Sequence, residues 1–191
     1  MQRGACTQPT WCLQYIDDGH ESKVQEEYKE KSLDFIHNLK LKLNSTESLY
    51  DFSRIFIWSL AKYFDASQGA FFVTKEKDGI RYLDFTAGYA YHIPDSETIT
   101  FEFGEGLSGQ VAKSGKLINL TTVPEGYITI LSGLGSASPK AMLIFPIVYN
   151  SKVEAVFELA SFKKFEEEDV KLILQTCNEL ESIFVNLLSK M

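Results

Sequence analysis

The chain has 191 residues, of which 45% are hydrophobic, and its net charge is −7. This size suits one globular domain with flanking helices, and the negative charge argues against a nucleic-acid surface, because phosphate binding needs clustered Lys and Arg. No apolar run reaches membrane-spanning length, and the first twenty residues lack the apolar centre of a signal peptide. We therefore expect a soluble, cytoplasmic protein with no membrane segment in this chain.

The three cysteines also fit a reducing compartment, because secreted disulfide-stabilised domains are smaller and richer in cysteine. Cys6, Cys12 and His20 form an incomplete ligand set whose spacing matches no usual zinc pattern. We therefore expect no metal site there, and we assign residues 1–20 to a flexible N-terminal tail.

Two helices are predicted after this tail. Residues 21–44 contain strong helix formers and a broken apolar stripe, which suits a linker or dimer helix. Asn44-Ser45 is expected to end this helix and to cap the next. The second helix, from about Thr46 to Phe64, is apolar nearly all round in its second half, so we expect it to lie buried across a sheet. Residues 45–191 would form the main domain.

From Ser67 the hydrophobic period changes to that of strands. Strands are expected over residues 69–75, 80–91, 98–103, 116–121, 141–149 and 152–162. Lys77-Asp78-Gly79 and Asn150-Ser151 have the composition of hairpin turns. A short helix is expected over 107–113 and a long one from Glu166 to Met191, whereas residues 122–140 look irregular. This order predicts an α+β fold with an antiparallel sheet.

Gly104, Gly106 and Gly109 have the spacing of a dinucleotide-binding motif, G-x-G-x-x-G. The helix after them is cut short by Ser114-Gly115, whereas a parallel crossover needs a dozen or more residues. Glu105 would also place a carboxylate beside a bound pyrophosphate. We therefore interpret the glycines as a tight turn with a close helix approach. Anion binding at the N-terminus of the short helix is the alternative.

The segment Gly104–Ala112, with the Ser114-Gly115-Lys116 that follows it, resembles the signature of GAF domains. The last hairpin, from Phe145-Pro146-Ile147 to Val153–Phe162, is similar to the closing hairpin of that family. Phe165–Asp169 resembles its entry into the C-terminal helix. The resemblance covers about Thr46 to Met191.

The segments Val123–Ile128 and Ser132–Pro139 are similar to a bacterial subgroup found in multidomain sensor proteins. The resemblance implies a signal-transduction module with a GAF-like (PAS-like) sheet of about six strands. Its N- and C-terminal helices would pack on one face, and a ligand pocket would lie on the other. Relatives bind cyclic nucleotides, tetrapyrroles, haem or small metabolites, many bind nothing identified, and they commonly dimerise through their end helices.

Departures from the family narrow the expected chemistry. No cysteine between Thr46 and Cys177 could attach a bilin, and the loop cysteines of free-methionine-sulfoxide reductases are absent as well. Cyclic-nucleotide-binding relatives share a sequence signature. This chain retains two of its residues, Phe165 and Asp169, but has Ser161 and Val170 where the signature has other polar residues. Ligand and cofactor therefore stay unknown.

Strand alternation predicts the pocket face of the sheet. In the last strand Val153, Ala155, Phe157 and Leu159 should meet the helices, which leaves Glu158 on the pocket face. Its carboxylate would bind a ligand amine or hydroxyl, or pair with a neighbour. The irregular stretch is interpreted as a lid over this face. The expected pocket residues are Phe85, Tyr89, Phe101, Phe103, Leu107, Val111, Tyr127, Ile128, Ser132, Phe145 and Glu158.

The final helix carries apolar residues at a spacing of three and four over three heptads. The expected dimer residues are Val170, Ile173, Cys177, Leu180, Phe184 and Leu187. A second set of apolar residues, which includes Leu172 and Leu174, widens this stripe. A single helix cannot bury both sets against one sheet. We therefore expect a homodimer through the end helices, with a possible downstream signalling domain.

Together these features predict a non-enzymatic sensory domain, in which binding of a small molecule changes how paired end helices pack. A ligand-free dimerisation or interaction module is the alternative. A GAF-fold enzyme, such as a free-methionine-sulfoxide reductase, is disfavoured by the cysteine pattern.

Overall fold

The computed structural model describes residues 11–91, 98–124, 126–132 and 135–190. The chain divides into two compact units, residues 1–38 and 39–191. The described part of the first unit belongs to helix α1 (Trp11–Asn44), in which Lys31 and Glu27 pair at 2.7 Å across one turn.

Helix α1 begins at Trp11 rather than near Glu21, so residues 11–20 are helical and do not form the expected tail. The sequence from Trp11 to Asn44 holds no proline and one glycine, so little in it interrupts a helix. Residues 1–10, including Cys6, lie outside the described residues, as do the side chains of Cys12 and His20.

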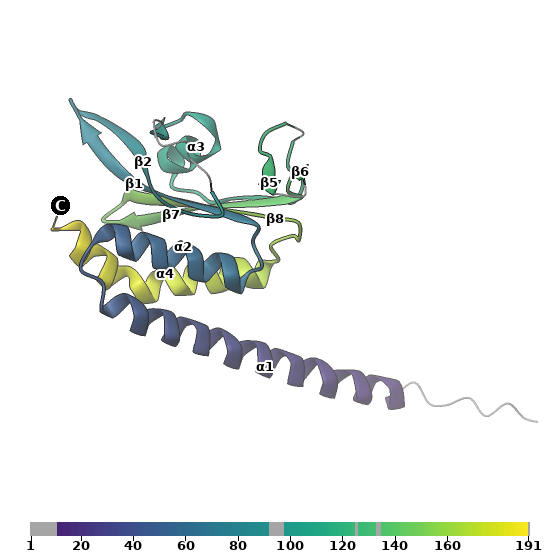
Figure 1. The fold of residues 1–191 in the computed structure, drawn as a ribbon. Coiled ribbons are helices and arrows are strands. Elements are labelled where there is room, and N and C mark those ends of the chain that lie inside the picture. Colours follow the sequence, from purple (N-terminus) through teal and green to yellow (C-terminus); the bar gives the residue numbers. More distant parts are fainter. Residues whose placement is uncertain (1–10, 92–97, 125, 133–134, 191) are drawn as a thin grey trace, which may run out of the picture. The chain divides into compact units, whose positions relative to one another are not determined.

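The second unit is built on a six-stranded antiparallel sheet with strand order β3-β2-β1-β8-β7-β4 (Figure 1). Its strands are β1 (Gln68–Lys77), β2 (Ile80–Tyr89), β3 (Thr100–Glu102), β4 (Ile118–Leu120), β7 (Ala141–Tyr149) and β8 (Lys152–Ser161). The predicted α+β antiparallel architecture is confirmed. The stretch expected to be irregular contains a separate hairpin, β5 (Ile130–Ser132) with β6 (Gly135–Ala137).

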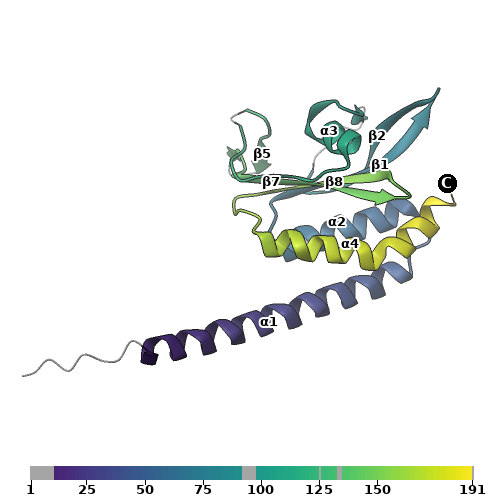
Figure 2. The ribbon, with the colours of Figure 1, turned by 180° about the vertical axis from the view of Figure 1, so that it is seen from behind.

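Helices α2 (Leu49–Tyr63) and α4 (Glu167–Leu188) cover one face of the sheet (Figures 1 and 2). Helix α2 is capped by Ser48, not Ser45, because the Ser48 hydroxyl accepts a hydrogen bond from the Asp51 amide at 3.0 Å. In α4 a capping box joins Glu166 and Asp169, whose carboxylate accepts from the Glu166 amide at 2.9 Å.

Aromatic rings hold these helices on the sheet. Phe56 of α2 meets Phe71 of β1 at 5.6 Å and Phe157 of β8 at 5.2 Å between ring centroids, both edge to face. Phe184 of α4 lies 5.5 Å from Phe52 of α2. Such pairs add about 0.5–1.5 kcal/mol each beyond the apolar area that they bury. The helical face is therefore a packed core that orders α2 and α4 on the sheet.

The apolar stripe of α4 is mostly buried within its own chain. Four of the six side chains expected to meet a second protomer are at most 3% exposed: Ile173, Leu180, Phe184 and Leu187. Their assignment to a dimer face is corrected, because these side chains are already buried within the protomer, as Phe184 is against Phe52 of α2 and Phe71 of β1. Val170 and Cys177 are partly buried, and Leu174 of the second set is 50% exposed.

Helix α3 (Gly106–Ser114) and the β5–β6 hairpin lie on the opposite face of the sheet (Figures 1 and 2). Gly104, in the turn before this helix, and Gly106, its first residue, have φ angles of 104° and 58°, which favour glycine. A Cβ at Gly109 would stand 2.3 Å from the carbonyl oxygen of Glu102. The interpretation of the glycines as a tight turn with a close helix approach is thus confirmed.

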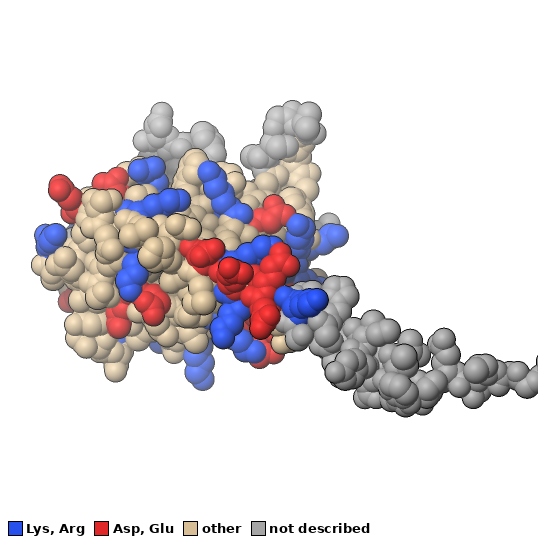
Figure 3. All heavy atoms as spheres, turned by 90° about the horizontal axis from the view of Figure 1, so that it is seen from below, with Lys and Arg blue, Asp and Glu red and all other residues tan. Residues whose placement is uncertain are grey.

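Charged side chains of both signs are mixed on the face of the molecule that Figure 3 shows. In the view of Figure 3, Lys and Arg lie scattered beside Asp and Glu rather than in one basic stripe. Lys40 and Glu179, for example, pair at 2.8 Å. None of the helices in the described part of the chain is both long and apolar enough to cross a membrane.

Candidate functional site

The two faces of the sheet have separate apolar cores. On β1, Phe71 faces the helices, whereas Phe72 faces α3 and lies 5.7 Å from Phe85 and 5.5 Å from Phe101. We call the second core the α3-side cluster; its buried members are Ala70, Phe72, Leu83, Val111, Ala112, Met142, Ile144, Val153, Val156 and Ala160. This is the face on which the sequence predicts a ligand pocket.

Six of the predicted pocket residues meet in the α3-side cluster: Phe85, Phe101, Phe103, Leu107, Val111 and Ile128. Val111 is fully buried, and the other five are partly buried and pack on the cluster. The structure therefore brings the expected wall of the pocket together, but these side chains fill much of the space themselves.

Tyr89 lies on the other face, contrary to the prediction. Its ring meets Trp58 of α2 edge to face at 5.3 Å. The cause is a β-bulge: Phe71 pairs with Ala87 and Phe72 with Phe85, which leaves Thr86 as an extra residue in β2. One extra residue turns every later side chain of the strand to the opposite face.

Phe145 also faces the helices rather than the pocket, since its ring stacks on Phe157 at 5.5 Å. A hairpin counted without interruption from its Asn150-Ser151 turn would pair Phe145 with Val156. The observed pairing is with Phe157, because Glu154 is an extra residue in β8. The same bulge places Val153 in the α3-side cluster, not among the side chains that meet the helices.

Glu158 is the main polar group among these apolar side chains. It extends from the middle of β8 toward α3, as predicted, and its Oε1 atom accepts a hydrogen bond from the hydroxyl of Ser108. Burial raises the pKa of the Glu158 carboxyl, and the hydrogen bond from Ser108 opposes this shift. A carboxyl in such a place can accept a hydrogen bond when ionised and donate one when protonated.

A small cavity adjoins Glu158. It has a volume of about 10 Å³ and is lined by Gln68, Tyr91 and Ile128 among others. This volume is close to the minimum that holds one water molecule. The Nε2 group of Gln68 donates to the carbonyl of Ala90 at 3.1 Å, whereas its buried Oε1 atom has no hydrogen-bond partner among the described residues. A buried amide oxygen without a partner is costly, so this acceptor is available to a donor that enters the cavity.

Two tyrosines stand close to the Glu158 carboxylate. Burial, and then the charge of Glu158, raise the pKa of Tyr91. The same two causes raise the pKa of Tyr127, while a hydrogen bond with the backbone of Leu107 opposes the shift. Tyr127 is nevertheless 45% exposed, so it lies at the rim of the site. The side chain of Ser132, the remaining predicted pocket residue, is outside the described residues.

Sequence reasoning did not find Ser108, Gln68 or Tyr91. Ser108 lies within the glycine-rich segment, where its position two residues into α3 turns it toward the sheet. Gln68 lies at the first position of β1, opposite Ala160 of β8. Gln68 shares the pocket face with Ala160, its cross-strand partner, but this pairing is known from the structure and has no local signal in the sequence.

We expect Glu158→Gln to change the pH dependence of stability. The folded pKa of Glu158 is raised above its ordinary value of 4.5, so the unfolded chain loses this proton first as pH rises. The wild type should therefore lose stability from about pH 4.5 upward, until the folded pKa is passed. The Gln variant should lack that loss and be at least as stable near neutral pH. Urea unfolding at about pH 4 and pH 7 measures the effect.

Glu102→Gln is the matched control, because Glu102 is an exposed carboxylate of β3. It should follow the wild-type pH profile. A Glu158→Gln variant with that same profile would show that burial does not penalise the Glu158 charge.

Comparisons with known proteins agree with this fold. A family model described as "GAF domain" matches residues 46–184. The GAF domain of an Acinetobacter phosphoenolpyruvate-protein phosphotransferase has a TM-score of 0.68 at 20% identity, over 83% of this chain and 96% of that one. The GAF domain of the corresponding Coxiella burnetii protein has a TM-score of 0.68 at 17% identity, over 83% and 95%.

Enzymes share the fold as well. Free methionine-R-sulfoxide reductase from Neisseria meningitidis, solved with its substrate, has a TM-score of 0.64 at 15% identity, over 84% of this chain and 92% of that one. At such identities the likeness shows the fold alone, and a comparison with curated proteins finds no match. The family model covers well over half of the chain, and the fold matches that of solved GAF domains. The chain therefore belongs to the GAF domain family.

Proposed function

We propose that this chain is a non-catalytic regulatory domain that binds a small molecule on the α3 side of its sheet. The observation that carries the proposal is the carboxyl of Glu158, which accepts a hydrogen bond from Ser108 in an otherwise apolar core. Beside it lies the Oε1 atom of Gln68, which has no hydrogen-bond partner within the part of the chain that the structure describes. Burying a polar group in an apolar core lowers the stability of the fold unless the group forms hydrogen bonds. Two neighbouring acceptors suit a ligand with an amine or hydroxyl group.

A ligand larger than water needs more room than the cavity of about 10 Å³ provides. Tyr91 and Ile128 line this cavity, so binding would displace them outward. The ligand would then favour an opened arrangement of the domain over the closed one. The size of this conformational response depends on how much more tightly the ligand binds the opened arrangement. Since α2 and α4 pack on the back of the same strands, a shift of β8 would reach both helices.

We also propose that the response is read out in a homodimer formed through the end helices. The buried stripe of α4 is used within the protomer, so the contact would use apolar side chains that remain exposed. Leu41 of α1 is 56% exposed and Trp58 of α2 is 43% exposed. Counting subunits by native mass spectrometry at micromolar concentration tests this, and a monomer would contradict it.

A non-catalytic role is supported by the cysteine chemistry. Reductases for free methionine sulfoxide share this fold, but the segment 46–184 holds one cysteine, Cys177. Cys177 belongs to α4, on the other side of the sheet from Glu158, and burial raises the pKa of its thiol to about 12. Because the thiolate is the reactive form, this thiol is a poor nucleophile.

The second candidate function is an interaction module that binds no small molecule. The observation in its favour is the aromatic packing on the α3 side: Phe72 contacts Phe85 and Phe101, and Phe85 contacts Tyr91 at 5.4 Å. A core of this kind needs no ligand for its stability.

A thermal-shift screen against amines, amino acids and polyols separates the two candidates. We expect at least one of these compounds to raise the melting temperature of the wild type, and to have at least about tenfold lower affinity for Glu158→Gln, because a charge-assisted hydrogen bond is lost. Glu102→Gln should respond like the wild type. A panel without any stabilising compound would favour the interaction module, and turnover of free methionine sulfoxide would contradict the non-catalytic role.

A further inference from the structure

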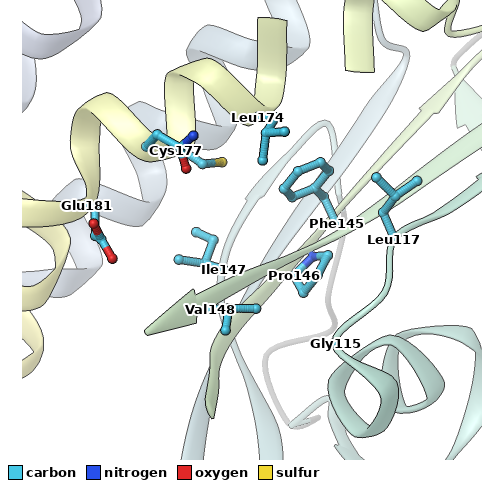
Figure 4. Close-up of a pocket in the computed structure, with 10 residues that line it drawn as sticks. Gly115, Leu117, Phe145, Pro146, Ile147, Val148, Leu174, Cys177 and Glu181 are labelled. Carbon is cyan, nitrogen blue, oxygen red and sulfur yellow. The ribbon is translucent and has the colours of Figure 1, made fainter. Parts of the chain in front are cut away.

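A second concave site lies on the helical side of the sheet, away from Glu158. Strand β4 pairs with β7 from Met142 to Ile144, so the rest of β7 has no outer neighbour among the described strands. Between this free part of β7 and helix α4 a groove of about 240 Å³ opens (Figure 4). We call it the β7–α4 groove; Leu117, Ile147, Val148, Leu174, Cys177 and Glu181 line it among others.

The groove has a buried floor and exposed apolar walls. Ile147 at its floor is 8% exposed, whereas Leu117, Val148 and Leu174 are 39%, 43% and 50% exposed. Its volume exceeds the roughly 150 Å³ of an apolar cavity that takes up benzene, and lies below the roughly 300–1,000 Å³ of sites for drug-sized ligands. The space therefore suits a molecule with a single ring or a short branched chain.

The polar groups of the groove are few and come from α4. In Figure 4 the sulfur of Cys177 points from α4 toward β7, and Glu181 lies one turn further along the helix. Burial raises the pKa of the Cys177 thiol to about 12, so this group is neutral at physiological pH. Glu181 is the one charged residue of the lining, and it takes part in no ion pair among the described residues. The electrostatic preference of the groove is therefore for a cation.

We propose that the β7–α4 groove binds a small organic cation that has an apolar body and a protonated amine. The body fills the space between Leu117, Ile147 and Leu174, and the amine pairs with the Glu181 carboxylate. An added peptide strand fits this edge less well, because Pro146 lacks the N–H group that strand pairing would use there. The ligand would contact both β7 and α4, so its binding would resist movement of α4 relative to the sheet.

Benzylamine and benzyl alcohol are suitable probes, because they share the ring and differ in the charge. In a titration followed by amide NMR of the full chain, benzylamine should cause saturable shifts at Leu117, Ile147 and Cys177. Glu181→Gln should weaken benzylamine about tenfold and leave the weaker binding of benzyl alcohol within about twofold. Glu168→Gln, an exposed carboxylate of α4 that does not line the groove, should leave both affinities unchanged.

Three results would overturn the proposal. Benzylamine could cause no saturable shift at the groove, or Glu181→Gln could leave its affinity unchanged. The groove resonances could instead broaden with protein concentration and sharpen in Leu174→Asp, which would assign the groove to a second copy of the chain. The site is independent of Glu158, so Glu158→Gln should bind benzylamine at the groove like the wild type.

Discussion

Replacing Phe184 by alanine is expected to lower the free energy of unfolding by about 3–5 kcal/mol. Phe184 is 1% exposed, and its ring contacts Phe52 at 5.5 Å and Phe71 at 6.5 Å. Truncation removes the buried apolar area of the ring and leaves a cavity between α4, α2 and β1. These three elements cannot all move inward to fill that cavity. Urea unfolding measured at several protein concentrations gives both the size of the loss and its dependence on association.

Leu174→Ala is the control on the same helix. Leu174 is 50% exposed, so its truncation should change stability by no more than about 0.5 kcal/mol. If the stripe of α4 were instead a dimer face, Phe184→Ala would weaken association and leave the stability of the monomer nearly unchanged. That outcome would contradict the packing of α4 described above.

Gly109→Ala is expected to destabilise the domain by about 3 kcal/mol, because the added methyl group overlaps backbone. A Cβ at Gly109 would lie 2.3 Å from the carbonyl oxygen of Glu102 and 3.1 Å from the amide nitrogen of Gly104. Neither atom can rotate away as a side chain can. The turn would have to open, and with it the hydrogen bond from the Gly104 amide to the Gly109 carbonyl at 2.7 Å. Thermal unfolding with calorimetry measures the loss.

Gln110→Ala adjoins this position and serves as its control. Gln110 is exposed, and alanine has a good helix propensity, so a change within about 0.5 kcal/mol is expected. Equal effects of the two substitutions would show that the turn tolerates a side chain at Gly109, and that the glycine spacing needs another explanation.

The fold was predictable because its signals are local. The hairpin turn Lys77-Asp78-Gly79, the long apolar strands β7 and β8, and the glycine turn before α3 each indicate their structure from a few residues. The side of the sheet on which Glu158 lies was predictable for the same reason, since it lies in an uninterrupted part of β8.

The errors in the site share one physical cause. A bulge adds a residue to one strand, and the side chains beyond it change face. Thr86 in β2 and Glu154 in β8 are such residues. The first places Tyr89 on the helical face; the second places Val153 on the α3 side and makes Phe157, rather than Val156, the partner of Phe145. Alternation read from one strand contains no information on its partner, so neither bulge could be placed from the sequence.

The stripe of α4 was harder to assign for a different reason. Apolar residues at a spacing of three and four suit a partner helix and a sheet equally well. Which set faces inward depends on the rotation of α4 on the sheet, which the contacts of Phe184 with Phe52 and Phe71 determine.

Neighbouring residues of β1 connect the two faces of the sheet. Phe71 packs under α2 and α4, and Phe72, the next residue, packs under the α3-side cluster. A ligand that opens the space around Glu158 would therefore press on strands whose other face holds the helices. This arrangement gives a direct structural route from the proposed pocket to α2 and α4.

The most direct measurement for the proposed pocket is native mass spectrometry of the freshly purified chain beside Glu158→Gln. We predict that part of the wild-type protein retains a small molecule, and that Glu158→Gln loses it while Glu102→Gln keeps it. The same adduct in both the wild type and Glu158→Gln would contradict the account. The account would also be contradicted if the wild type and both variants all showed the mass of the protein without a ligand, and if no compound in the thermal-shift screen stabilised the wild type.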